Sequence, residues 1–205
     1  MRRGSRVMEI LAVALLGVAT IGSAWCGYQA SRWNSDESEF AREASDLQVE
    51  AAREFGLATQ TVSYDSNMAA QYARAVVEGD EQLQRFYRET LIRPDFLPIL
   101  DEWQSSAEAG NGPPPNLFED QDYIDAELSD YQETAAKAQA KSAEGEEAGT
   151  NADDYVLTTL LLASALFFAG LTTSFRVRGA QMLLLVGSGV LLAYAAARLV
   201  DAPVS

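Results

Sequence analysis

Three apolar segments divide this chain into parts suited to a membrane and parts suited to water. They occupy residues 7–26, 155–175 and 180–200. Each is close to the roughly 20 residues that an α-helix needs to cross a hydrocarbon core about 30 Å thick. The sequence therefore predicts an integral membrane protein with three transmembrane helices.

The positions of the arginines indicate an orientation, because cytoplasmic loops collect positive charge. The arginines next to the inner ends of the predicted spans are Arg2, Arg3, Arg6, Arg176 and Arg178. We therefore expect a multi-pass protein of the plasma (inner) membrane, with the N-terminus (1–6) and the turn 176–179 in the cytoplasm. Residues 27–154 and the tail 201–205 are then outside.

Two features of the outer membrane edge fit this orientation. Trp25, Tyr28 and Trp33 lie where an outer aromatic belt is expected. Arg198 is close to the outer end of the third span, and a long side chain in that place can reach the headgroups by snorkelling. A cleaved signal peptide is the alternative for residues 7–26, but this apolar stretch exceeds the roughly 7 to 15 residues typical of a signal peptide. We therefore favour a retained anchor.

The outer segment is strongly acidic. The whole chain has a formal net charge of −15, and most of the arginines near the membrane lie outside residues 27–154. Such a surface repels nucleic acid and attracts cations or basic partners. A solvated helical surface explains the same composition, so only a nucleic-acid partner is excluded.

Residues 27–79 are expected to form an ascending stalk helix. Apolar residues recur there at spacings close to three and four, which places them on one stripe of a helix. The stripe contains Phe40, Ala44, Leu47, Ala51, Phe55, Ala58, Val62, Ala69, Tyr72 and Val76. Asn34 and Glu37 resemble a capping box, which predicts a bend at Gly27 and a restart of the helix. Asp65 or Ser66 could cap a further restart.

Residues 119–154 are expected to form the descending stalk helix, which packs on the ascending one as in a coiled coil. Its stripe contains Ile124, Leu128, Tyr131, Ala135, Ala138 and Ser142, followed by Gly145 and Gly149. The side chains shrink toward the membrane, so close packing is expected there. Residues 144–150 have a second interpretation as a flexible joint, and Thr150 or Asn151 is expected to cap the second span.

Residues 80–118 are expected to form a small helical tip. Asp80 can cap a short helix that reaches Leu91 and that Pro94 ends, and a second short helix covers residues 96–103. Residues 112–115 read as a rigid, non-helical connection. Apolar residues concentrate in this tip, and we expect a small core with part of the cluster, including Phe96 and Trp103, as an interaction surface.

The sequence contains few features that indicate a catalytic, cofactor or metal site. The chain has no His and a single Cys, Cys26, and no phosphate-binding or nucleophile motif occurs. We therefore expect a non-enzymatic protein without catalytic residues, cofactor or dedicated metal site. The acidic run 119–127 fails the calcium-loop pattern, so its acids are explained by the helix dipole, with weak divalent-cation binding between subunits as the alternative. Cys26 reads as a packing residue or as a bridge between two subunits.

Small residues in the spans indicate helix association. Two ladders have the small-xxx-small spacing that lets helices pack closely. They consist of Ala165, Ala169 and Thr173, and of Gly189, Ala193 and Ala197. The polar residues of the second span, Thr158, Thr159 and Ser164, are expected to bond to their own helix backbone. The ladders favour a homo-oligomer, or association with another membrane protein.

The chain resembles an uncharacterised family of small three-span prokaryotic membrane proteins with a helical extracytoplasmic domain. The residues that carry the resemblance are the stretch from Trp25 to Trp33, the pair Phe86 and Tyr87, the stretch from Asp154 to Leu157, the stretch from Phe167 to Gly170, and the pair Phe175 and Arg176. The resemblance implies the topology and no activity.

These observations together predict an all-α membrane protein, in which an extracytoplasmic helical hairpin and a small tip rise from three transmembrane helices. The expected function is that of an oligomeric, membrane-anchored scaffold or interaction module. The alternatives are a subunit of an ion channel or transporter complex, and a sensor that acts through a partner.

Overall fold

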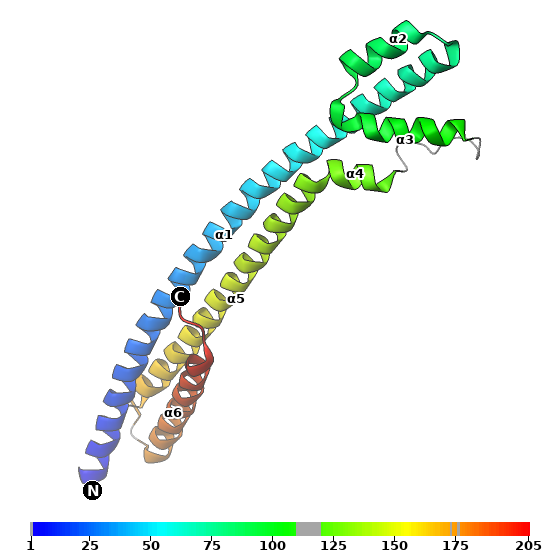
Figure 1. The fold of residues 1–205 in the computed structure, drawn as a ribbon. Helices are drawn as coiled ribbons and strands as arrows, with labels where there is room; N and C mark the ends of the chain where they lie inside the picture. The colour runs from blue at the N-terminus through cyan, green and yellow to red at the C-terminus, as the bar shows by residue number, and fades with distance from the viewer. Residues whose placement is uncertain (1, 110–119, 173, 176) are drawn as a thin grey trace. The chain divides into compact units, whose positions relative to one another are not determined.

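The computed structural model describes residues 2–109, 120–172, 174–175 and 177–205, and these residues form helices and connections without a strand. The helices are α1 (Arg2–Glu78), α2 (Glu81–Phe86), α3 (Leu97–Glu108), α4 (Gln121–Glu127), α5 (Ser129–Leu171) and α6 (Arg178–Asp201), with a π-helical turn at Tyr87–Leu91 and a 3-10 turn at Pro94–Phe96 (Figure 1). The predicted all-α fold class is therefore confirmed.

The chain divides into two compact units. The first unit comprises Met1–Glu43 and Ala140–Ser205, and the second unit comprises Ala44–Gln139. The long helices α1 and α5 contribute residues to both units. Each unit is described by itself.

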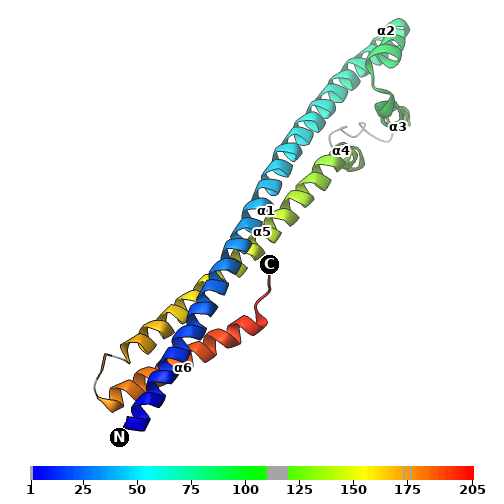
Figure 2. The ribbon, with the colours of Figure 1, turned by 90° about the vertical axis from the view of Figure 1, so that its left-hand side faces the viewer.

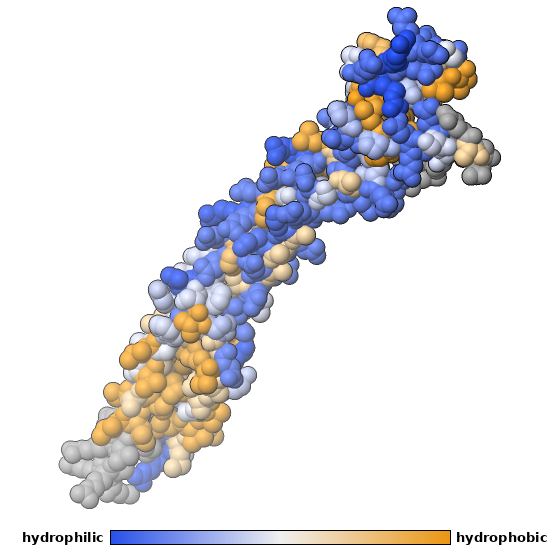
Figure 3. Space-filling model, viewed as in Figure 1, coloured by the Kyte–Doolittle hydropathy of each residue, from blue (hydrophilic) through white to orange (hydrophobic). Residues whose placement is uncertain are grey.

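The first unit contains the apolar helices. α1, α5 and α6 are each long and apolar enough to cross a membrane, and within this unit they lie side by side (Figure 2). Apolar residues cover much of the face of this unit that Figure 3 shows, as expected for helices in contact with lipid. Its core consists of Ala19, Cys26, Ala30, Tyr155, Leu162 and Ala195. Most of these side chains are small, so the helix backbones approach closely.

α1 is continuous, so the predicted bend at Gly27 and the restart at Asn34 are wrong. Ser38 Oγ donates to the backbone oxygen of Asn34 at 2.8 Å, in the middle of the helix. The restart predicted at Asp65 or Ser66 is also wrong, because Ser66 Oγ donates to Val62 O within the same helix. Side chains that can cap a helix also fit a helix interior when their hydroxyl groups bond to the preceding turn.

α5 is also continuous across residues 144–150, so the predicted joint and the cap at Thr150 or Asn151 are wrong. Thr150 Oγ1 donates to Glu146 O at 2.9 Å inside the helix. The two glycines of this stretch face α1. A Cβ atom built on Gly145 would lie 3.5 Å from Cβ of Phe40, and one on Gly149 would lie 3.0 Å from Cδ of Glu37. The small residues thus bring α5 close to α1, and this packing offsets their low helix propensity.

The second unit has a core at the tip. It consists of Ala69, Tyr72, Ile92, Phe96, Leu100 and Tyr123. The stripe predicted on α1 is largely buried, with Ala44, Ala51 and Ala58 each at most 7% exposed. Phe55 and Val76 are exceptions, because both are exposed. The Phe55 ring instead lies against the ring of Tyr131, with centroids 5.2 Å apart.

Two aspartates begin the short helices of this unit. Asp80 Oδ1 accepts from the backbone nitrogen of Leu83 at 2.9 Å, and Asp120 Oδ1 accepts from that of Tyr123 at 3.1 Å. The descending helix therefore begins as α4, and it is interrupted at Leu128 before α5, where one helix was predicted. The predicted connection 112–115 lies outside the described residues.

Candidate functional site

The ladder predicted on α5 packs inside the protein. Ala165 and Ala169 are 1% and 0% exposed. Ser188 on α6 donates from Oγ to the backbone oxygen of Ala165 at 2.9 Å. Ala165 therefore lies against α6 of the same chain, Ala169 is buried within the chain, and Thr173 lies outside the described residues.

The ladder predicted on α6 is largely exposed, in contrast to the one on α5. Ala193 and Ala197 are exposed, Gly189 is half-buried, and a Cβ atom built on Gly189 would meet no atom within 4 Å. Large apolar residues are exposed on the same helix, namely Met182, Leu183, Val186, Val190 and Tyr194. This face of α6 packs against no other part of the described chain.

Phe96 and Trp103 lie in the core of the tip. Phe96 is 1% exposed, and its ring centroid is 5.4 Å from that of Tyr123. Trp103 is half-buried against the same cluster. The structure therefore places Phe96 inside the second unit, where its packing role is satisfied by the chain itself.

A polar network anchors this tip to α1, and sequence analysis did not identify it. The carboxylate of Asp65 is completely buried. Its oxygens accept hydrogen bonds from Arg93 Nε at 3.1 and 3.2 Å and from Arg93 Nη2 at 2.6 Å. The hydroxyl of Tyr123 donates to Oδ2 of the same carboxylate at 2.7 Å. Arg93 Nη2 also reaches Glu127 Oε1 at 2.6 Å, so the network joins three separate segments.

The electrostatics of the network favour a protonated Tyr123 and a charged Arg93. Burial raises the pKa of Tyr123, and its hydrogen bond to Asp65 raises that pKa further. The hydrogen bond from Arg93 to Asp65 raises the pKa of the guanidinium above its ordinary value. A buried charge is stable only when it is paired and hydrogen-bonded. Both oxygens of Asp65 accept from protein donors, which fits an anchor of the fold better than a reactive group.

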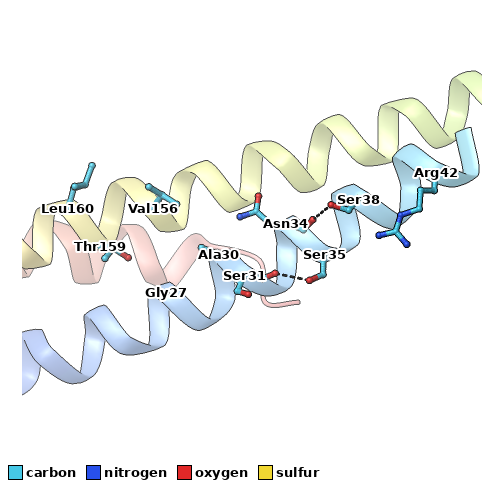
Figure 4. A pocket seen from close by; sticks show the side chains of 10 residues that line it. All are labelled: Gly27, Ala30, Ser31, Asn34, Ser35, Ser38, Arg42, Val156, Thr159 and Leu160. Atoms are coloured by element: carbon cyan, nitrogen blue, oxygen red, sulfur yellow. Dashed lines mark hydrogen bonds between the residues drawn. The ribbon is translucent and has the colours of Figure 1, made fainter. Parts of the chain in front are cut away.

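An open groove lies on the first unit between α1 and α5. Its volume is about 650 Å³. α1 lines it with Gly27, Ala30, Ser31, Asn34, Ser35, Ser38 and Arg42, and α5 lines it with Val156, Thr159 and Leu160 (Figure 4). The apolar residues of α5 lie at one end, whereas Arg42 lies at the other end (Figure 4). The groove is therefore amphipathic along its length.

The hydroxyl groups of the groove bond mainly to their own helix. Ser35 Oγ donates to Ser31 O at 3.0 Å, and Ser38 Oγ donates to Asn34 O at 2.8 Å. Thr159 Oγ1 donates to Tyr155 O at 2.9 Å. These bonds leave a surface of small, internally satisfied side chains, which suits contact with another helix.

Arg198 and the C-terminal tail bind to residues of α1 and α5. Arg198 Nη2 lies 2.7 Å from Oδ1 of Asp154, so an ion pair accompanies the predicted snorkelling position. The backbone oxygen of Pro203 accepts from Trp33 Nε1 at 3.3 Å and from the hydroxyl of Tyr155 at 2.9 Å. Ser205 Oγ donates to Asp36 Oδ2 at 2.7 Å. Residues 201–205 thus fasten α6 to α1 and α5, a role that sequence analysis did not predict.

Metal ligands do not gather in the part of the chain that the structure describes: it contains no group of three or more His, Cys, Asp or Glu side chains placed to hold an ion. Cys26 is fully buried in the core of the first unit. This burial agrees with the interpretation of Cys26 as a packing residue. Cation binding between subunits stays a prediction.

No protein-family model, curated protein or solved structure matches the chain. The described residues form an all-helical protein with three helices that are apolar enough to span a membrane.

Proposed function

We propose that this chain is a non-enzymatic, oligomeric scaffold anchored in the plasma membrane, with its acidic second unit outside the cytoplasm. The resemblance to an uncharacterised family of three-span membrane proteins is part of this proposal and adds no activity to it. The five inner arginines support the orientation. The acidic exterior would meet basic partners or cations.

The observation that carries the proposal is the unpartnered ladder on α6. The α5 ladder is used within the chain, where Ala165 and Ala169 are buried. Ala193 and Ala197 have the same spacing and are exposed. Small residues let helices approach closely enough for van der Waals packing and backbone contacts in a membrane. A second helix against this face of α6 gives the exposed ladder the role that the buried one already has.

The polar groups support a scaffold more than an enzyme. The buried carboxylate of Asp65 is paired with the partly exposed Arg93, and Tyr123 and Glu127 complete the network. The ion pair between Arg198 and Asp154 likewise joins two helices. Each of these groups has a structural partner, and none forms a pair of titratable groups facing an open pocket.

A channel subunit is the weaker alternative. A conducting path needs polar walls, and the candidates are Thr158, Thr159 and Ser164 of α5. Each donates instead to a backbone oxygen four residues earlier, at 2.8, 2.9 and 2.9 Å. The hydroxyl proton of each is thereby used within its own helix.

The proposal is tested by the mass of the full chain in mild detergent, measured by native mass spectrometry. We expect a multiple of 22.2 kDa for the unmodified protein. Ala193→Leu adds bulk to the ladder and should shift the population toward the monomer. Val18→Leu adds similar bulk at an exposed position of α1, a different helix from the one that carries the ladder, and should leave the mass unchanged.

Two results would contradict the scaffold. The unmodified protein could be monomeric both in mild detergent and in nanodiscs that contain native lipid. Alternatively, reconstituted bilayers could show a steady, ion-selective current that changes in Thr158→Val, Thr159→Val and Ser164→Val, which would establish the channel.

A further inference from the structure

The groove between α1 and α5 has an unusual charge for this protein. The chain has 30 acidic residues, yet no carboxylate lines the groove. The acids of the adjoining stretch of α1 are Asp36, Glu37, Glu39 and Glu43, and all of them lie off its wall. The only charged lining residue is Arg42, which is exposed and forms no ion pair with any residue that the structure describes. The groove is therefore complementary to a partner that carries carboxylates.

The spacing of the lining residues matches the packing seam of a helix. Ser31, Ser35, Ser38 and Arg42 follow one another at intervals of four, three and four, and all four are exposed. This alternation is the repeat by which one helix presents a face to another over several turns. Gly27 and Ala30 keep the floor of the groove low, so a second helix can come close.

The length of the groove excludes a lipid as its main occupant. The rise of about 1.5 Å per residue makes the stretch from Gly27 to Arg42 about 22 Å long. The headgroup zone on one side of a bilayer is only about 5 to 8 Å thick. A lipid bound at the end with Val156 and Leu160 would leave most of the wall unoccupied. A helix of about 15 residues covers all of it.

A second copy of this chain offers a matching ridge at the required height. Copies in one membrane share an orientation, so equal parts of the two chains lie at equal depth. The exposed ridge of α5 is formed by Glu146, Thr150, Asp153 and Leu157, at spacings of four, three and four. It is acidic at the end away from the membrane and apolar toward the membrane. The groove has the corresponding order, from Arg42 to Leu160.

The contacts within one copy set the height of Arg42 relative to α5. Lys141 Nζ lies 3.2 Å from Glu43 Oε2, and a Cβ atom built on Gly145 would lie 3.5 Å from Phe40. Residues 141–145 of α5 are therefore level with residues 40–43 of α1, in antiparallel order. Glu146 of a second copy would lie about one helical turn from the level of Arg42, a distance that the two long side chains can bridge.

We propose that the groove is the site at which a second copy docks, with the ridge of its α5 in the groove and Arg42 paired with Glu146 of the second copy. This inference rests on the proposed oligomer and identifies one of its interfaces. α5 carries the ridge on one side and lines the groove on another side. Two copies related by a two-fold axis can therefore each place the ridge of α5 in the groove of the other.

The test uses the full chain and measures its assembly in mild detergent and in nanodiscs. Arg42→Glu places like charges together at the interface, and we expect association to weaken at least about tenfold. Glu146→Arg alone should weaken it similarly. The double variant Arg42→Glu, Glu146→Arg restores the opposite charges and should recover most of the assembly.

A second pair of variants tests the shape of the groove. Ser35→Trp fills it and should dissociate the copies. Ser105→Trp is the matched control, because Ser105 is also an exposed helical serine whose hydroxyl donates to the carbonyl four residues earlier. It should assemble like the unmodified protein. Helical content of both variants, followed by circular dichroism, verifies folding.

The outcomes separate this inference from the proposed oligomer. The docking site is rejected if Arg42→Glu and Ser35→Trp assemble like the unmodified protein, or if the double charge reversal fails to restore assembly. In those cases, loss of assembly in Ala193→Leu would still support the scaffold through α6. A lipid that co-purifies with the unmodified protein and is lost in Ser35→Trp without a change in assembly would also reject the second copy as occupant.

Discussion

The hydroxyl group of Tyr123 donates a 2.7 Å hydrogen bond to Oδ2 of Asp65, although the two residues are 58 positions apart. Asp65 lies in the interior of α1, and Tyr123 lies in the short helix α4. Arg93 binds the same carboxylate from the segment between them. One buried charge therefore holds the tip on α1.

Asp65→Asn should lower the free energy of unfolding by about 2 kcal/mol, because it removes the charge that two donors surround. The loss is smaller than for a fully enclosed pair, since Arg93 is 32% exposed and keeps Glu127 as a partner. Thermal unfolding of the full chain in detergent, followed by circular dichroism, measures the effect. Asp101→Asn is the control, because it breaks an exposed ion pair to Arg88 and should cost less than about 1 kcal/mol. Equal losses in the two variants would contradict the anchoring role of Asp65.

Stability should fall at high pH because of Tyr123. Burial raises the pKa of Tyr123 in the folded protein above its ordinary value of about 10. The fold therefore favours the protonated phenol. Its contribution is fully present below about pH 10 and is lost as the pH rises toward the folded pKa. Titration of the melting temperature between pH 8 and 11 should show this decline.

Tyr123→Phe should flatten that decline, while it removes one hydrogen bond at neutral pH. Tyr64→Phe is the matched control, since the hydroxyl of Tyr64 donates to the backbone oxygen of Leu91 and not to a carboxylate. It should keep the slope of the unmodified protein. An unchanged slope in Tyr123→Phe would show that other groups cause the alkaline loss.

The sequence is sufficient for the helical class and for the stripes that pack α1 on α5. Ala44, Ala51 and Ala58 recur with a period that only a buried helix face requires, and they are buried. Asp80 was also identified correctly, because the capping interaction involves only neighbours along the chain. The apolar periodicity of one helix, and capping within one turn, can be predicted without knowledge of the tertiary structure.

Contacts between segments that are distant along the chain could not be predicted from the sequence. Asp65 has the residue type of a helix cap, and only its contacts with Arg93 and Tyr123 show why it lies inside α1. Asn34 and Thr150 were likewise interpreted as caps, although their stretches bond within continuous helices. The sequence did not predict the groove, because its wall consists largely of small and polar residues, which produce no apolar periodicity.

Gly145 provides a test of the close approach between α1 and α5. Gly145→Ala should raise the free energy of unfolding by up to about 1 kcal/mol, because alanine is the better helix former. Its methyl group would lie 3.5 Å from Phe40 Cβ, which is an ordinary contact. Gly145→Leu should instead destabilise by about 1 to 3 kcal/mol, since the backbone atoms of Glu37 and Ala41 are within 4 Å of the added Cβ and have little room to move.

Thermal unfolding in detergent, followed by circular dichroism, measures the stability of both Gly145 variants. Gly56→Leu is the control, because a Cβ atom built on Gly56 meets no atom within 4 Å. The larger side chain should be tolerated there. If Gly145→Leu were as stable as Gly145→Ala, the two helices would not approach each other closely at this position.

The proposed scaffold requires that the three helices span a membrane with the second unit outside the cytoplasm. Single cysteines at Ser105 and at Gly179, both exposed positions, can be placed in a Cys26→Ala background and treated with a membrane-impermeant thiol reagent on intact cells. We predict that the cysteine at 105 is labelled and that the one at 179 is labelled only after the membrane is permeabilised. Labelling at 179 on intact cells without labelling at 105 would contradict the orientation, and with it the outer scaffold.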